Sequence, residues 1–185
     1  MLQARPCRNA VAKHQWGGRS LFDFPEKPSC INGSVELWRR CFPNATCANI
    51  SYNTKVNDSD FIHLRGLHTL WMDGCEQSRD AALEHLAGIQ ALSLMQCQGI
   101  TDKGIVYLAG ISLLNIRFIK GITETFVPIL FGARAITLTF SPWVGYHRCP
   151  FSSAGLKALM AAGTEIEHFD DGEIRVGIWA GRGGW

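Results

Sequence analysis

The chain has no long hydrophobic run and little charge of either sign. No apolar stretch reaches the roughly 18 residues that a membrane-spanning helix needs. The first thirty residues carry basic side chains but no continuous apolar block, which argues against a secretory signal peptide. The formal net charge is only +2, from 18 basic and 16 acidic residues. We therefore expect no membrane span, and no nucleic acid as a partner.

Motifs that carry chemistry are missing as well. The sequence contains no GxSxG, P-loop, HExxH or GxGxxG pattern. Its seven cysteines form no CxxC pair, and their odd number speaks against a disulfide framework. His63 and His85 stand 22 positions apart, and His147 lies near Cys149, but neither pair has further metal ligands beside it. We expect a protein that is not an enzyme and holds no cofactor or metal.

What the chain does contain is a repeat of 22 residues. Leu67–Gly88 and Ile89–Gly110 align without a gap, so that apolar residues, a cysteine, an aspartate and a final glycine coincide. Ala45–Gly66 and Ile111–Gly132 keep the same pattern. A fifth repeat starts in register, but its helix-like leucines arrive about seven residues late, which predicts an insertion near 141–152. A period of 22 lies within the roughly 20 to 29 residues of leucine-rich repeats.

Each repeat reads as a short strand followed by a helix. In Thr69–Asp73, Leu70 and Met72 alternate with polar or aromatic neighbours, as on a strand with one buried side. In Asp102–Leu108 the apolar residues follow helical spacing. Stacked repeats would align their strands in a parallel ladder. The sequence therefore predicts an α/β leucine-rich-repeat solenoid, with short parallel strands on the concave face and helices on the convex face.

The ends of the chain are less regular. A helix over Ser34–Cys41, with Ser34 as its N-cap and with Val35, Trp38 and Phe42 turned inward, would cover the first repeat. A sixth strand is expected around Ile166–Phe169, followed by a strand-like tail. The predicted parts are an irregular N-terminal segment with its cap, about five repeats, and a C-terminal cap, at residues 1–44, 45–163 and 164–185.

Some polar groups recur with the repeat. A column of acids could in principle hold a metal or serve acid–base chemistry, but we favour capping of the helix starts by Asp58, Asp80, Asp102 and Glu124. Cys75 and Cys97 are expected to be buried structural thiols rather than metal ligands. Groups that recur in every repeat explain the fold. Function is therefore expected at positions that vary.

The outward strand positions vary from repeat to repeat, as a recognition surface requires. Tryptophan, methionine and arginine are enriched in interface cores and hot spots, and all three occur here. Loops on a rigid scaffold often bind partners too, although the insertion could equally form a hydrophobic lid, and the tryptophan could merely shield the strand edge. The candidate partner-binding residues are Thr69, Trp71, Asp73, Met95, Asn115, Arg117, Thr137, Thr139, Trp143 and Tyr146.

The repeat resembles a known subtype. The line LxxLxLxxCxxITDxGLxxLAG, carried by Cys75, Cys97 and the run Ile100–Ile105, is similar to the cysteine-containing leucine-rich repeat of F-box proteins. It also resembles the short repeat of a mitochondrial ATP-synthase coupling factor. The likeness covers Ala45 to Ala162, and Met1 to Arg40 shows no clear F-box pattern. The resemblance implies a protein-binding horseshoe, frequently the substrate-recognition part of a ubiquitin ligase.

These observations predict a monomeric protein–protein interaction module that binds a partner through its concave face, in the cytoplasm or nucleus. One alternative is an adaptor or substrate-recognition subunit of an F-box-type ubiquitin ligase, with ligase components as partners. Another is a mitochondrial coupling or assembly factor of the ATP-synthase type.

Overall fold

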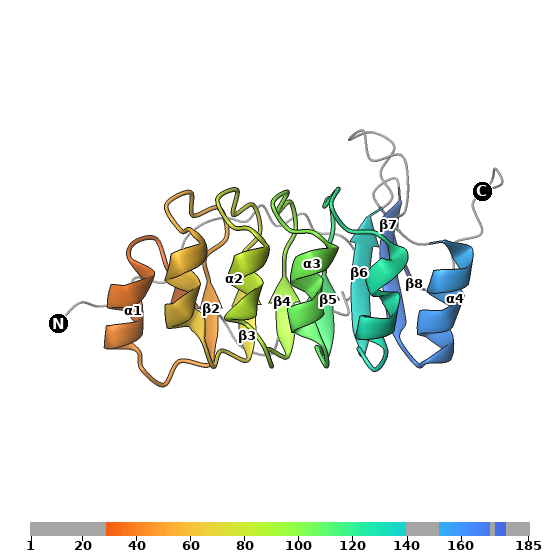
Figure 1. The fold of residues 1–185 in the computed structure, drawn as a ribbon, viewed down its shortest axis with the longest axis horizontal. Coiled ribbons are helices and arrows are strands. Elements are labelled where there is room, and N and C mark those ends of the chain that lie inside the picture. Colours follow the sequence, from red (N-terminus) through yellow and green to blue (C-terminus); the bar gives the residue numbers. More distant parts are fainter. Residues whose placement is uncertain (1–28, 140–151, 171–172, 177–185) are drawn as a thin grey trace.

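The structure, a computed structural model, describes residues 29–139, 152–170 and 173–176. It is an α/β arrangement in which eight strands form one sheet in the order of the sequence (Figure 1). Six successive pairings are parallel, and only the last, between β7 and β8, is antiparallel. The helices lie side by side along one face of this sheet (Figure 1).

The strands are short. They are β1 (Ser29–Cys30), β2 (Cys47–Asn49), β3 (Thr69–Trp71), β4 (Ala91–Ser93), β5 (Leu113–Asn115), β6 (Ala135–Thr139), β7 (Glu165–Asp170) and β8 (Glu173–Val176). From β2 to β6, each strand pairs residue for residue with positions 22 further along the chain, beginning with Cys47 opposite Thr69. The period of the sequence is therefore the register of the sheet.

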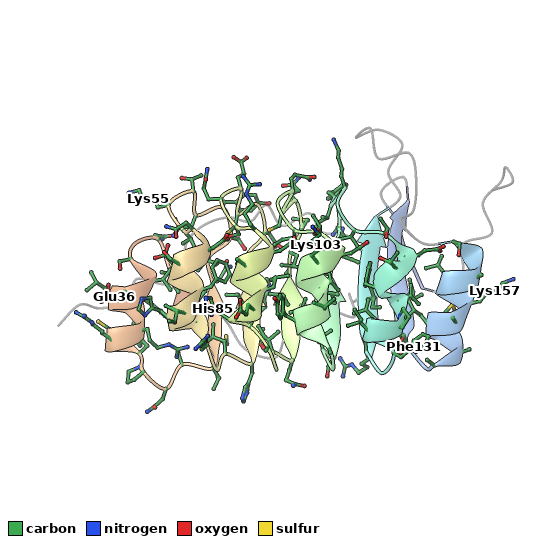
Figure 2. All side chains as sticks on the ribbon, viewed as in Figure 1. Glu36, Lys55, His85, Lys103, Phe131 and Lys157 are labelled. Atoms are coloured by element: carbon green, nitrogen blue, oxygen red, sulfur yellow. The ribbon has the colours of Figure 1, made fainter. Side chains whose placement is uncertain are left out.

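The helical segments alternate with the strands. They are α1 (Val35–Cys41), η1 (Asp58–Leu64), α2 (Asp80–Glu84), α3 (Asp102–Ile105), η2 (Val106–Leu108), η3 (Glu124–Leu130) and α4 (Ser153–Ala161), with η marking 3₁₀ geometry. Figure 2 shows charged side chains such as Lys103 on the side of the helices that faces away from the sheet. None of the helices in the described ranges is long and apolar enough to cross a membrane.

The core lies between the helices and the sheet. Strand side chains alternate, so the middle residue of each strand points to the helices while its neighbours point away. Leu70 and Met72 are fully buried, as predicted, and the helices contribute Phe61 and Leu83. Buried residues from every repeat contribute to one continuous cluster on this side of the sheet. Each strand–helix unit thus buries its apolar side against its neighbours.

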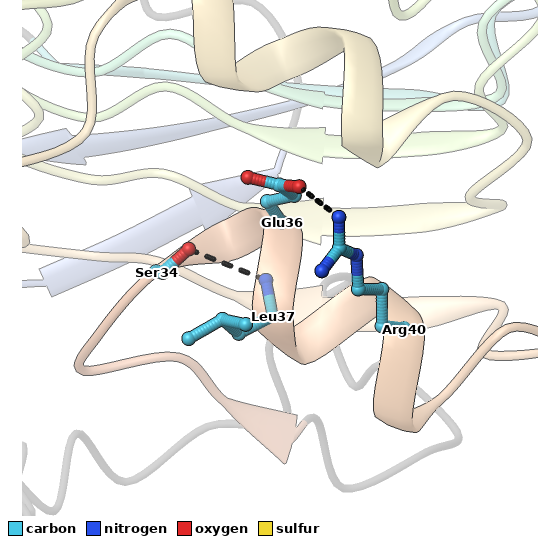
Figure 3. Close-up of polar contacts among 4 residues, drawn as sticks. All are labelled: Ser34, Glu36, Leu37 and Arg40. Atoms are coloured by element: carbon cyan, nitrogen blue, oxygen red, sulfur yellow. Dashed lines mark hydrogen bonds and ion pairs between the residues drawn. The ribbon is translucent and has the colours of Figure 1, made fainter.

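Helix α1 closes the N-terminal end of this core. Ser34 Oγ accepts a hydrogen bond from Leu37 N at 3.2 Å, and Glu36 pairs with Arg40 at 2.7 Å (Figure 3). The predicted helix and its N-cap are confirmed, and Val35 and Trp38 are buried. The prediction that Phe42 turns inward is wrong, since 41% of this residue is exposed. Phe42 is the C-cap, with φ −130°, and has left the helical path that would have aimed it at the core.

The C-terminal part departs from the period as predicted. The β6–β7 pairing joins Ala135 to Glu165, 30 positions apart instead of 22. Strand β7 covers the expected sixth strand, and β8 ends the parallel ladder by pairing antiparallel. The strand at Ser29–Cys30 differs from the irregular structure expected up to about residue 30, because these two residues pair with β2.

Candidate functional site

The recurring acids connect neighbouring units. Asp58 accepts a hydrogen bond from Arg79 N at 2.6 Å, and Asp80 accepts one from Thr101 N at 2.7 Å. Asp102 does the same with Thr123 N at 2.7 Å. In each case the acid is the first residue of its helix, and the donor is the N-cap residue of the next unit, 21 positions later. We expected each acid to cap the start of its own helix, and that prediction is wrong. Each acid instead accepts a hydrogen bond from the next unit, which is also a structural role.

The corresponding hydrogen bond of Glu124 gives the length of the insertion. Glu124 Oε2 accepts from Ser152 N at 2.8 Å, 28 positions later instead of 21. Seven extra residues therefore lie before α4, as the sequence predicted. The bonds from Ser152 lower the pKa of the exposed Glu124. Burial alone would raise the pKa of Asp102, but hydrogen bonds from Thr123 and Thr125 outweigh it and lower that pKa. Acids held ionised in this way stabilise the stack.

The cysteine column is also structural. Cys75 Sγ donates to Ile50 O at 3.2 Å, and Cys97 Sγ donates to Met72 O at 2.9 Å, in each case the carbonyl of the preceding unit. Both thiols are fully buried, as expected. Burial raises the pKa of Cys75 to about 12 and that of Cys97 still further. Such thiols stay protonated and are poor nucleophiles.

His63 and His85 make different contacts. His85 Nδ1 lies 3.0 Å from Arg65 Nη2, whereas His63 offers only its backbone carbonyl, to Arg39 Nε at 2.7 Å. Within the described residues, no three His, Cys, Asp or Glu side chains gather as a metal site would require. His147 and Cys149 lie outside those residues.

The candidate binding residues lie on the side of the sheet that faces away from the helices, which is the side expected to be the concave face. We call this side the outer face. It comprises the strand residues that alternate with the core positions, together with the residue two places beyond each of the strands β3, β4 and β5. The predicted residues whose side chains are described there are all partly exposed: Thr69, Trp71, Asp73, Met95, Asn115 and Arg117.

Part of the outer face is buried. Ala91, Leu113 and Ala135 lie side by side on β4, β5 and β6 and form a second apolar cluster, separate from the main core. Only 8% of Leu113 is exposed. The described helices pack on the other side of the sheet, so this cluster is not an extension of the core that they cover. The outer face thus has an apolar centre beside the more exposed polar residues.

A polar ladder crosses the outer face next to this cluster. Ser93 Oγ donates to Asp73 Oδ1 at 2.5 Å, and Met95 N donates to the same oxygen at 3.0 Å. Asn115 Nδ2 then donates to Ser93 Oγ at 3.0 Å. Burial raises the pKa of Asp73, which these bonds and the charge of Arg117 only partly offset. The carboxyl group of Asp73 is thus held where burial disfavours its charged form.

Tyr52 belongs to this site and was not predicted. It is exposed, and its ring lies against Gly74, since a Cβ built on Gly74 would sit 2.5 Å from Tyr52 Cδ1. Its backbone N–H donates to Asp73 O at 2.7 Å. Tyr52 has φ +59°, a left-handed conformation that costs a non-glycine residue about 1–3 kcal/mol. Gly74, Gln96 and Phe118, which follow in the same column at intervals of 22 residues, share this conformation, and the glycine is the only sign of it in the sequence of that column.

The other predicted residues are less fully described. The Arg117 guanidinium carbon lies 5.4 Å from the ring centroid of Phe118, and its charge also acts on Asp73 and Tyr52. Thr137 and Thr139 lie on β6, opposite Glu167 and Phe169 of β7. Trp143 and Tyr146 fall outside the described residues.

No family model, curated protein or solved structure matches this chain.

Proposed function

We propose that this chain is a leucine-rich-repeat solenoid and acts as a non-enzymatic protein–protein interaction module. The observation that carries the proposal is the contrast between the two kinds of positions. Acids, thiols and leucines that recur every 22 residues make contacts between neighbouring units. The outer face instead carries a different set of side chains in each repeat, including Trp71, Met95 and Arg117.

The outer face has the composition of a recognition surface. Partly exposed aromatic, sulfur and charged groups lie on it, beside the cluster of Ala91, Leu113 and Ala135 that is already buried within the chain. Aromatic, Met and Arg side chains are the types enriched in interface cores and hot spots. The recurring groups that could suggest an enzyme, the thiols of Cys75 and Cys97 and the column of acids, are engaged in contacts between units. A partner segment lying across β3 to β5 would contact all three anchor residues.

The more specific roles remain predictions from the resemblance. A substrate-recognition subunit of a ubiquitin ligase and a mitochondrial coupling factor would both use the same surface. Residues Leu37–Arg40 lie in α1, where Trp38 is buried against the first unit. This segment thus caps the first repeat whether the chain is a ubiquitin-ligase subunit or a coupling factor.

Affinity capture with matched variants tests the proposal. Trp71→Ala combined with Arg117→Ala alters the outer face, whereas Glu84→Ala combined with Lys103→Ala alters exposed helical positions. Partners of the wild-type chain should be lost from the first variant and retained by the second. Retention of every partner by the outer-face variant, with its melting curve unchanged, would contradict the proposal.

A further inference from the structure

The apolar cluster on the outer face is more deeply buried than its strand neighbours can account for. Only 8% of Leu113 is exposed, although the residues beside it on β4 and β6 are Ala91 and Ala135. Side chains stand upright on a sheet, so two methyl groups are too short to cover a leucine between them. Asn115, the next outward residue of β5, is engaged with Ser93. Since the described helices pack on the opposite side (Figure 1), the cover of Leu113 comes from another part of the chain.

Burial on the outer face extends to the N-terminal end of the sheet. Cys47 stands on β2 in the same row as the cluster, and only 9% of it is exposed, whereas Thr69 on the next strand is partly exposed. Cys47, Trp71 and Arg117 also have further interactions within the chain. The cover therefore concerns the face from β2 to β6 and not one strand alone.

The length and the attachment of residues 1–28 fit this cover. These residues lead into β1, which pairs with β2 at the edge of the sheet. Neighbouring strands lie about 4.8 Å apart, so β5 is roughly 19 Å from β1, while an extended chain spans about 3.3 Å per residue. Leu21 and Phe22 precede Ser29 by eight and seven residues and can therefore reach Leu113. Trp16 is a further apolar side chain within reach.

The other candidate segments are attached at the wrong end of the sheet. Residues 140–151 join β6 to α4, and residues 177–185 follow β8 at the opposite edge from β1. Neither segment begins near β2, where Cys47 is buried. The row of buried residues from Cys47 to Ala135 thus favours the N-terminal segment over both.

We propose that residues 1–28 lie across the outer face, with apolar side chains such as Leu21 and Phe22 on Leu113, and that a partner must displace them. The occupancy stands apart from the proposed function, whereas the competition with a partner rests on it. Apolar and aromatic side chains gain by covering an apolar cluster. A segment of the same chain also acts at an effective concentration on the order of millimolar, so that weak contacts suffice. The partner that takes its place should likewise present an apolar side chain to Leu113.

Maleimide labelling of Ala91→Cys in the full-length chain tests the occupancy. The new thiol stands beside Leu113 and should react slowly while the segment covers it. Replacing the apolar side chains of the segment should raise the labelling rate about tenfold or more, because the contacts that cover the thiol are lost. The replacements in this segment variant are Trp16→Ser, Leu21→Ser and Phe22→Ser.

Two matched controls remove apolar side chains from the other segments and should leave the rate unchanged. They are Trp143→Ser with Tyr146→Ser, and Ile178→Ser with Trp179→Ser. Cys75, which is fully buried in the core, should stay unlabelled in every variant and thereby show that the fold is intact. Faster labelling in either control, or a segment variant that labels as slowly as its parent, would overturn the inference.

Affinity capture separates the competition from the proposed function. With Ala91 restored, the segment variant should retain about threefold or more of each partner than the wild type, since no segment has to be displaced. Equal retention would overturn the competition, whatever the labelling shows about the occupancy. Partners that bind the Trp71→Ala, Arg117→Ala variant as tightly as the wild type would instead contradict the proposed function.

Discussion

At the scale of single residues, Asp73 should make the stability of the fold depend on pH. Burial raises its folded-state pKa above the unfolded value. The ionised carboxylate therefore destabilises the fold above the folded-state pKa, and this penalty disappears as the pH falls through that pKa toward the unfolded one.

Asp73→Asn should accordingly unfold at a higher urea concentration than the wild type near pH 7. The difference should shrink as the pH is lowered through the raised pKa, because only the wild type gains from protonation at this position. Urea midpoints measured across this range compare the two proteins directly. A wild type that is the more stable at neutral pH would show that the charge of Asp73 is compensated within the chain.

The buried thiols give a second prediction at this scale. Cys97 is fully buried with a strongly raised pKa, while Cys41 is exposed. A maleimide should modify Cys41 in the native chain and reach Cys97 only after unfolding, which mass spectrometry of the digested protein can resolve. Cys97→Ala should cost about 1–2 kcal/mol, because Met72 O loses its thiol donor and a small cavity forms. Rapid native labelling of Cys97 would contradict its structural role.

At the scale of elements, Arg39 attaches α1 to the first unit beside the buried Val35 and Trp38. Its guanidinium donates to the carbonyls of His63, Arg65 and Ala45 at 2.7, 2.9 and 3.0 Å, and it lies 5.3 Å from the ring centroid of Trp38. Arg40, by contrast, makes an exposed pair with Glu36.

Arg39→Ala should lower the free energy of unfolding by about 2–3 kcal/mol, since several charged hydrogen bonds are lost and the end of the core loosens. Arg40→Ala removes the same charge and should cost less than about 0.5 kcal/mol. Chemical denaturation of the two variants gives the comparison. Equal effects would show that α1 is not held by the carbonyl contacts.

The bridges between units give a pH-dependent prediction. Hydrogen bonds lower the folded-state pKa of Asp102 below its unfolded value, so its contribution is present above the unfolded pKa and is lost as the pH falls through the folded one. Asp102→Asn loses the bonds to Oδ2 and should cost about 1 kcal/mol at pH 7, a modest value because the group is partly exposed. The difference from wild type should close in acid, as melting curves can show. A difference that persists at low pH would contradict the bridge.

At the scale of the whole molecule, periodicity carried much of the prediction. The 22-residue spacing predicted the parallel register, the buried side of each strand and the length of the insertion, because each unit meets the same neighbours. Phe42 and the strand at Ser29–Cys30 escaped prediction for the opposite reason. Their positions depend on one tertiary contact each, at the end of α1 and along the edge of β2, and leave no period in the sequence.

The candidate site was only partly predictable. Alternation along the strands is enough to place Trp71, Asp73 and Arg117 on one face. It could not place Tyr52, because only the glycine one repeat later, Gly74, marks the left-handed backbone of that column. Nor could it reveal that Ser93 and Met95 would hold the Asp73 carboxylate. Alternation in the sequence identifies which side chains share a face, but the site itself is defined by contacts between strands.

The central claim is that partners bind the outer face. A photo-crosslinking amino acid at Met95, compared with one at Lys103 on the helical side, tests it most directly. We predict that partners of the chain become covalently attached through position 95 and not through position 103. Attachment through position 103 with none through position 95 would contradict the account.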